Sequence, residues 1–137
     1  GITAMYSILI VDDSSLMRSM IKRIIQVSDF PCNDLRYAEN GREGLEVMRE
    51  HHVDLLVVDI NMPVMDGSEM IAAVRADNSI SATSVLVIST EGSEKKLDKL
   101  ASMGVRCVIH KPFRPEEFVQ AMHNALNGIR LLEHNAV

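Results

Sequence analysis

Short apolar runs alternate along the chain with segments in which apolar residues recur every three or four positions. A continuous apolar run is typical of a strand covered on both faces, whereas the wider spacing is typical of a helix with one buried face. The runs at 7–11, 54–58 and 85–88 therefore predict buried strands, and weaker runs at 35–38 and 106–109 predict two more.

Helical spacing fills the intervals between these strands and follows the last of them. The apolar positions that carry the spacing in the five predicted helices are Met17, Met20, Ile21 and Ile24; Leu45 and Met48; Met70, Ile71 and Val74; Leu97, Leu100 and Ala101; and Phe118, Met122, Ala125 and Ile129.

Residues suited to helix starts stand at the borders of the helical segments. Asp13 or Ser14 can cap the first helix. Asn40 and Ser93 can cap the second and the fourth, and Pro115 suits the first turn of the last. Five strand–helix units in succession predict one α/β domain, a doubly wound parallel sheet of five strands with five helices on its two faces.

Composition agrees with an ordinary globular domain. The 137 residues are 47% hydrophobic and 24% charged, and the net charge of -5 argues against a nucleic-acid partner. No apolar run approaches the roughly 18 residues that a membrane span needs, so no membrane insertion is expected. With no secretion signal at its start, and with Cys32 and Cys107 read as free thiols, the chain is expected to be cytoplasmic.

The chain divides into three parts on the same reasoning. Met5 directly precedes the first strand, so residues 1–4 are interpreted as a cloning remnant. Residues 5–128 form the predicted domain, and residues 129–137 are a C-terminal tail.

Polar residues gather where the predicted strands end. They are Asp12 and Asp13 after the first strand, Asp59 after the third, Ser89 and Thr90 at the end of the fourth, and Lys111 after the fifth. Open parallel sheets bind ligands beyond the carboxyl ends of their strands, so these side chains are expected to share one cleft. Clustered carboxylates suit Mg²⁺ or Mn²⁺, and a lysine with a hydroxyl suits phosphate oxygens. Together they indicate phosphoryl transfer to a carboxylate.

Each of these residues also has an ordinary structural interpretation. Asp12 and Asp13 could simply favour a helix N-terminus, and Asp59 could be a turn residue. Lys111 could be a solvated loop charge. The convergence of all of them favours a functional site over these separate explanations.

The motifs around these positions resemble those of response-regulator receiver domains. The matching segments are Val11-Asp12-Asp13, Val58-Asp59-Ile60-Asn61-Met62-Pro63, Met65-Asp66-Gly67, Ile88-Ser89 and Lys111-Pro112-Phe113. The intervals of 30 residues from Asp59 to Ser89 and 22 from Ser89 to Lys111 are similar to the family's spacing. The likeness covers residues 7–127, and Arg18 with the Asn61/Glu91 pair resembles the chemotaxis-type subgroup.

The resemblance implies a flavodoxin-like strand order of 2-1-3-4-5 and a role for each site position. Asp59 would be the phosphoacceptor, in a reaction that depends on Mg²⁺. The metal would be held by Asp12 (mainly through a water), Asp13, Asp59 and the backbone carbonyl of Asn61. The residues near the phosphoryl group would be Ser89, Thr90 and Lys111, with a cis bond between Lys111 and Pro112 and with Asn61 and Glu91 tuning dephosphorylation.

Two positions depart from the family's usual pattern. Val108 stands at the output switch position, where an aromatic residue is common, and Thr90 stands where Ala or Gly is common. The implied partners are a sensor histidine kinase or phosphotransfer protein and a downstream protein target. The target would bind a face made by the fourth helix, fifth strand and fifth helix, whose basic residues are Lys95, Lys96, Lys99 and Arg106.

Other functions compete with a signalling switch that has no independent substrate turnover. Haloacid-dehalogenase-like phosphatases carry Asp-x-Asp after their first strand, whereas Asp59 follows the third and precedes Ile60-Asn61. A flavodoxin-like cofactor binder would need a Ser/Thr/Gly loop where Asp12 and Asp13 would repel a phosphate. A narrower alternative is a receiver domain excised from a larger response regulator or hybrid kinase.

Overall fold

The computed structural model describes residues 5–90 and 94–128, with only the backbone of residues 94–96. Several sequence predictions therefore lie outside the described residues. These are the remnant at 1–4, the tail at 129–137 with Ile129, the cap at Ser93, the role of Glu91 and the side chains of Lys95 and Lys96.

Strands and helices alternate through the described chain as the sequence predicts. Their bounds are β1 (Tyr6–Val11), α1 (Ser15–Val27), β2 (Cys32–Ala38), α2 (Gly41–Glu50), β3 (Leu55–Asp59), α3 (Gly67–Ala76), β4 (Ser84–Ser89), α4 (Glu94–Ser102), β5 (Cys107–His110) and α5 (Pro115–Leu126). β2 starts three residues before the predicted 35–38, because its polar, half-exposed first residues give no continuous apolar run. None of the described helices is both long enough and apolar enough to cross a membrane.

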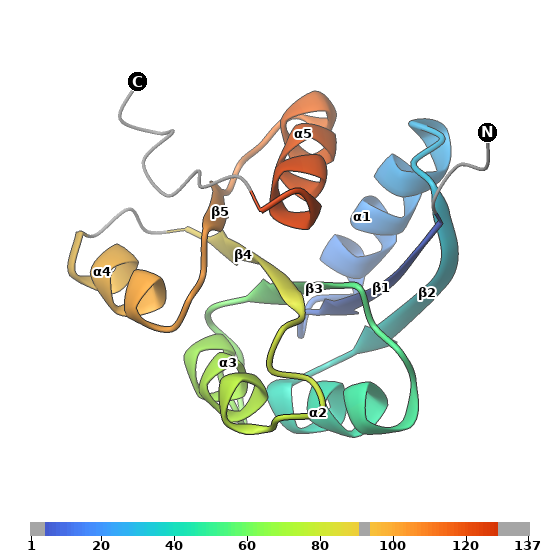
Figure 1. Cartoon of the computed structure of the whole chain (residues 1–137). Coiled ribbons are helices and arrows are strands. Elements are labelled where there is room, and N and C mark those ends of the chain that lie inside the picture. The colour runs from blue at the N-terminus through green and yellow to red at the C-terminus, as the bar shows by residue number, and fades with distance from the viewer. Residues whose placement is uncertain (1–4, 91–93, 129–137) are drawn as a thin grey trace.

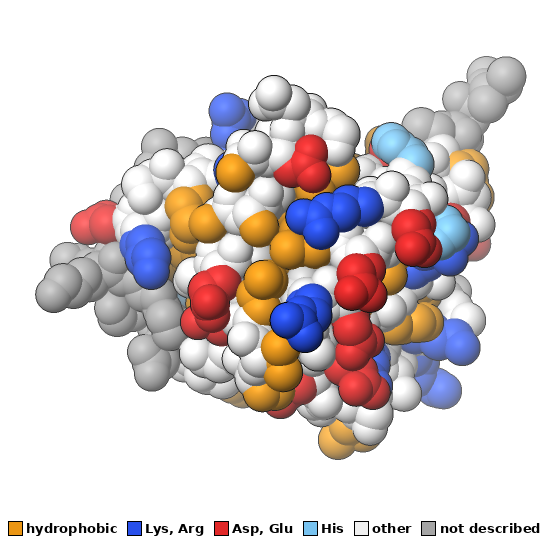
Figure 2. Space-filling model, turned by 90° about the horizontal axis from the view of Figure 1, so that it is seen from below, with side chains coloured by type: hydrophobic (Ala, Val, Ile, Leu, Met, Phe, Trp, Pro, Cys, Tyr) orange, Lys and Arg blue, Asp and Glu red, His pale blue; other side chains and the backbone are white. Residues whose placement is uncertain are grey.

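The five strands form one parallel sheet with the order β2-β1-β3-β4-β5, which confirms the predicted fold class. Helices α1 and α5 cover one face, and α2, α3 and α4 cover the other (Figure 1). Because successive strand residues point to opposite faces, Ile8 and Ile10 pack under α1 and α5, whereas Leu9 and Val11 pack toward α2 and α3. Seen from the α2 and α3 side, acidic, basic and apolar side chains are interleaved (Figure 2).

Capping interactions set the helix starts close to the site. Ser14, one of the two predicted caps, accepts a hydrogen bond from the Met17 N–H at 3.1 Å, and Asn40 accepts one from the Glu43 N–H at 3.0 Å. Pro115 opens α5, as predicted. The helix starts that border the site are therefore specified locally.

Arg75 of α3 forms hydrogen bonds with two loops at the opposite end of the sheet from the site. Its guanidinium donates to the carbonyls of Ser81 and Thr83 at 2.7 and 2.9 Å, and to the carbonyl of Met103 at 2.9 Å. Burial lowers the pKa of Arg75 more than any other effect, and the nearby Arg106 charge lowers it further. The Arg75 side chain thus connects the α3–β4 loop to the chain just after α4.

Candidate functional site

The carboxyl ends of the central strands meet at one edge of the sheet. Val11 pairs with Val58 across β1 and β3, and Ser89 pairs with His110 across β4 and β5. The polar residues that end or follow these strands are therefore neighbours. The convergence expected from the sequence is present, while the chemical role of each residue remains a prediction.

Three carboxylates form the centre of this edge. One oxygen each from Asp12, Asp13 and Asp59 lies within 4.8 Å of the others. Asp12 is 0% and Asp59 6% exposed, whereas Asp13 faces solvent. The buried Asp12 Oδ2 has no hydrogen-bond partner among the described residues. A hard divalent cation fits this set, because it would offset the negative charge of the carboxylates and interact with the Asp12 oxygen that accepts no hydrogen bond.

The electrostatics of Asp12 follow from its position. Burial is the largest cause that raises the pKa of Asp12, from 3.8 to about 6, and the charges of Asp59 and Asp13 raise it further. The backbone N–H of Ser14 and the Lys111 ammonium lower it, without cancelling the rise. The metal-free site therefore carries an electrostatic cost that a cation would relieve.

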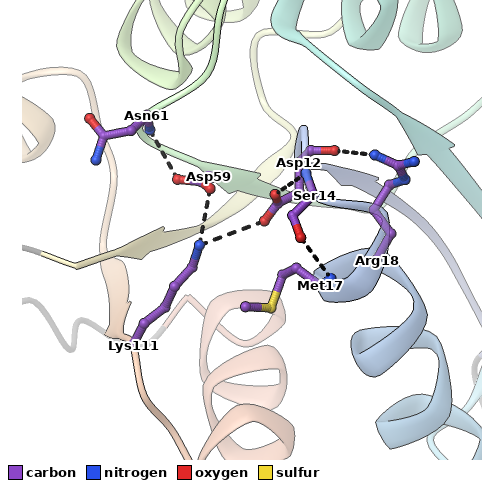
Figure 3. Close-up of polar contacts among 7 residues, drawn as sticks. All are labelled: Asp12, Ser14, Met17, Arg18, Asp59, Asn61 and Lys111. Carbon is purple, nitrogen blue, oxygen red and sulfur yellow. Dashed lines mark hydrogen bonds and ion pairs between the residues drawn. The ribbon is translucent and has the colours of Figure 1, made fainter.

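Asp59 is held from both sides (Figure 3). Its Oδ1 accepts a hydrogen bond from the Asn61 N–H at 2.9 Å, and its Oδ2 accepts one from Lys111 Nζ at 3.1 Å. The same ammonium lies 3.9 Å from Asp12 Oδ2, so Lys111 bridges the two buried acids. The bond between Lys111 and Pro112 is cis, as the resemblance implied.

Arg18 supports the Asp12 backbone, a role that the motif comparison did not assign. Its Nη1 donates to the Asp12 carbonyl at 2.6 Å, and its Nη2 lies 3.8 Å from Glu39. The Ser14 N–H also donates to Asp12 Oδ1 at 2.9 Å. The sequence had singled out Arg18 only by its likeness to the chemotaxis-type subgroup, and its place six residues after Asp12, early in α1, brings it within reach of the Asp12 carbonyl.

Gly67 lies against the backbone of Asp59, and no role was predicted for it. A Cβ at Gly67 would lie 2.5 Å from the Asp59 carbonyl oxygen. The Gly67 N–H donates to the Ile60 carbonyl at 3.1 Å, and Asp66 forms a capping box with Glu69. The start of α3 is thus packed directly beneath the β3 end, where only glycine fits.

The other predicted positions differ in their exposure to solvent. Ser89 is 1% exposed, and its carbonyl accepts the Lys111 N–H at 2.9 Å, whereas Thr90 is exposed. Val108, the predicted output position, is 2% exposed and belongs to the same core cluster as Leu100. Lys99, from the predicted basic face, is exposed.

Comparisons with known proteins agree with this geometry. The family model of the response regulator receiver domain matches residues 8–123. The chain is 35% identical to chemotaxis protein CheY of Listeria monocytogenes over 121 residues, 88% of this chain and 98% of that protein. It is also 35% identical to CheY of Bacillus subtilis over 123 residues, 89% and 98% of the two chains. The structure of the chemotaxis response regulator CheY4 of Vibrio cholerae superimposes with a TM-score of 0.81 at 32% identity, covering 89% of this chain and 99% of that one.

Proposed function

Because this chain belongs to the response regulator receiver domain family, we propose that it is a phosphorylation-activated switch of a two-component phosphorelay. A sensor histidine kinase or a phosphotransfer protein supplies the phosphoryl group, and a downstream protein binds the phosphorylated form. Residues 5–128 are the proposed receiver unit, acting in the cytoplasm. The observation that carries the proposal is the recessed Asp59 carboxylate, held between Lys111 and the Asn61 N–H beside two further acids.

The proposed step is transfer from a phosphohistidine to Asp59. A carboxylate oxygen of Asp59 forms a bond to phosphorus while the phosphorus–nitrogen bond breaks, and the electron pair returns to the imidazole. Lys111, already 3.1 Å from Asp59 Oδ2, offsets the charge on the phosphoryl oxygens. Ser89 and Thr90 lie at the end of the neighbouring strand as hydroxyl donors to the same group. The acceptor is the protein's own side chain, so we propose no independent substrate turnover.

The metal of this site is proposed to be Mg²⁺, held by Asp12 (mainly through a water), Asp13, Asp59 and the Asn61 carbonyl. When bound, the ion supplies charge neutralisation for the carboxylates and the incoming phosphoryl oxygens. The support for this assignment is the buried Asp12 Oδ2, which accepts no hydrogen bond from the described residues, and the three carboxylate oxygens within 4.8 Å. Asn61, with Glu91, is the proposed determinant of how fast the phosphoryl group is lost.

Labelling with acetyl phosphate tests the phosphosite. In the presence of Mg²⁺, intact-mass analysis should find one added phosphoryl group that hydroxylamine removes. Asp59→Asn should abolish the label, whereas Asp98→Asn, which removes the same charge from an exposed position on α4, should keep it. Undiminished labelling of Asp59→Asn would contradict the assignment, and turnover of a free phosphorylated metabolite would favour an enzyme.

The output surface is proposed to be the face made by α4, β5 and α5. A phosphorylated Asp59 adds about -1.5 to -2 charges beside Ser89 and Lys111, which join β4 and β5 to the site. Exposed Lys99 and Arg106 support an acidic, amphipathic segment as the partner's contact. A partner that prefers the phosphorylated state must also stabilise that state.

Amide hydrogen exchange tests this surface. Adding beryllofluoride with Mg²⁺ should alter exchange across α4 and β5 as well as in the loop after β3. Changes confined to the loops around Asp59 would mean that the signal leaves by another face.

A further inference from the structure

A pocket of about 300 Å³ lies at the opposite end of the sheet from the three carboxylates. Its lining includes Arg75 of α3, Thr83 and Ser84 at the start of β4, Arg106 just before β5, and Gly128 after α5. No Asp or Glu is found among the described residues that line it. The pocket therefore gathers two positive charges in a chain whose net charge is -5.

The two arginines are held by uncharged partners. The Arg75 guanidinium donates to backbone carbonyls before β4 and after α4, and Arg106 Nη1 donates to the Gly128 carbonyl at 3.2 Å. Neither guanidinium forms an ion pair with a carboxylate of the described residues. Burial lowers the pKa of Arg75 most, and the Arg106 charge lowers it further, so the two cations repel each other. An anion between them would relieve this repulsion.

Hydrogen-bond donors remain available on separate walls of the pocket. The bond to Gly128 uses only one of the N–H groups of Arg106. The Ser84 hydroxyl, half-buried at the start of β4, makes no hydrogen bond to the described part of the chain. A tetrahedral phosphate accepts hydrogen bonds from several directions, whereas a carboxylate accepts mainly in one plane. Donors that belong to separate chain segments therefore favour a phosphate.

We propose that this pocket binds a small anion through its phosphate group, between Arg75, Arg106 and the Ser84 hydroxyl. No aromatic residue is among the described lining residues, so a nucleotide base would find no ring on which to stack. The ligand is therefore inorganic phosphate or a small phosphomonoester. The site is separate from Asp59, and it extends beyond the proposed function of the chain.

Titration of the ¹⁵N-labelled protein with inorganic phosphate, in EDTA at neutral pH and constant ionic strength, tests the proposal. The amide signals of Ser84, Gly104 and Arg106 should shift together, with a dissociation constant of about 1 to 10 mM. Arg106→Gln should weaken binding roughly tenfold and Ser84→Ala about threefold, because each removes a donor. Arg106 is exposed, so its replacement should leave the remaining amide signals unchanged. The matched control is Arg42→Gln, which removes an exposed arginine from α2 and should bind phosphate as wild type does.

Two further ligands identify the chemistry that the pocket recognises. Malonate, a dicarboxylate of similar charge, should bind roughly fivefold more weakly than phosphate, and equal affinity would overturn the assignment to phosphate. Glycerol 3-phosphate should bind the same residues. A tighter dissociation constant than that of inorganic phosphate would identify a phosphomonoester as the ligand, and a weaker one would identify the free ion.

Several outcomes would overturn the site itself. These are an absence of shifts in wild type, an equal loss of affinity in Arg42→Gln, and shifts confined to the loops around Asp59. Binding seen only in Glu133→Gln would also overturn it, because a carboxylate of the chain's own tail would then be the occupant. No phosphodonor is present in the titration, so its failure would leave the proposed function of Asp59 untouched.

Discussion

Replacing Asp12 with Asn should stabilise the metal-free protein, by an amount that grows as the pH rises. Burial, more than any neighbouring charge, raises the pKa of Asp12 from 3.8 to about 6 in the folded state. The folded protein therefore binds this proton more tightly than the unfolded chain does. The resulting stabilisation is fully present below about pH 3.8 and is lost as the pH rises through about 6. The amide of the Asp12→Asn variant has no proton to lose, and its oxygen can still accept the Ser14 N–H.

The size of the effect follows from the pKa difference. A difference of about 2 between the folded and unfolded states corresponds to about 3 kcal/mol at neutral pH. Screening by solvent should reduce this value little, because Asp12 is 0% exposed. The substitution also loses the attraction to Lys111 Nζ, 3.9 Å from Asp12 Oδ2. We therefore expect a net gain in the free energy of unfolding of about 2 kcal/mol at pH 7, most of it acquired between about pH 4 and 6.

Urea unfolding in EDTA across this pH range measures the gain. Wild type and Asp12→Asn should be close in stability at about pH 4 and should separate as the pH rises. Asp98→Asn serves as the control, because it removes an exposed carboxylate and should stay parallel to wild type. Mg²⁺ should reverse the order by stabilising wild type more than Asp12→Asn.

A gap between the Asp12→Asn and wild-type curves that stays constant with pH would refute the assignment of the raised pKa to Asp12. A loss of stability in the variant at neutral pH would show that the Lys111 attraction outweighs the cost of burying the charge.

Three further predictions concern the surroundings of the site. Thr90→Ala should lose the phosphoryl group faster than wild type, whose half-life we expect to be minutes or less; a slower loss of label would show that Thr90 does not shield it from water. Gly67→Ala should lower the free energy of unfolding by about 2 kcal/mol and slow acetyl phosphate labelling, because the new Cβ would lie 2.5 Å from the Asp59 carbonyl oxygen. Unchanged unfolding and labelling would mean that the loop adjusts freely. Arg75→Met should cost about 3 kcal/mol in urea unfolding, since three carbonyls lose a charged donor at 2.7 to 2.9 Å. A cost as small as that of Arg106→Met, which removes a 3.2 Å hydrogen bond to the Gly128 carbonyl, would argue against a stabilising role for the Arg75 hydrogen bonds.

The elements that could be predicted from the sequence are those whose burial leaves a periodic trace. β1, β3 and β4 are covered on both faces, so each appears as a continuous apolar run. β2 lies at the sheet edge and keeps polar residues such as Asn33 and Asp34, so its start was predicted three residues late. Met20 has helical spacing but is 40% exposed, because spacing alone does not fix how far the buried stripe extends.

The identity of the site residues also came from the sequence, because parallel strands carry their carboxyl ends to one edge of the sheet. Asp12, Asp59 and Lys111 could be placed together in this way without coordinates. What each environment does to its residue could not. Only the tertiary structure buries Asp12 while leaving Asp13 in solvent, and that burial, which depends on neighbouring chain segments, sets the pKa.

The strain at Val64 and the glycine requirement at Gly67 were likewise decided by tertiary structure. Val64 has a φ of 67° in a turn closed by the Met65 N–H to Pro63 carbonyl hydrogen bond, and hydrogen bonds to α2 and to the start of α3 hold the loop on either side of it. Gly67 must lack a Cβ because α3 begins against the Asp59 backbone. Side-chain periodicity records which residues are buried, so the sequence determines the layers and the strand ends. Backbone contacts between segments that are distant along the chain leave no periodic pattern of apolar residues in the sequence. They can therefore be known only from the folded structure.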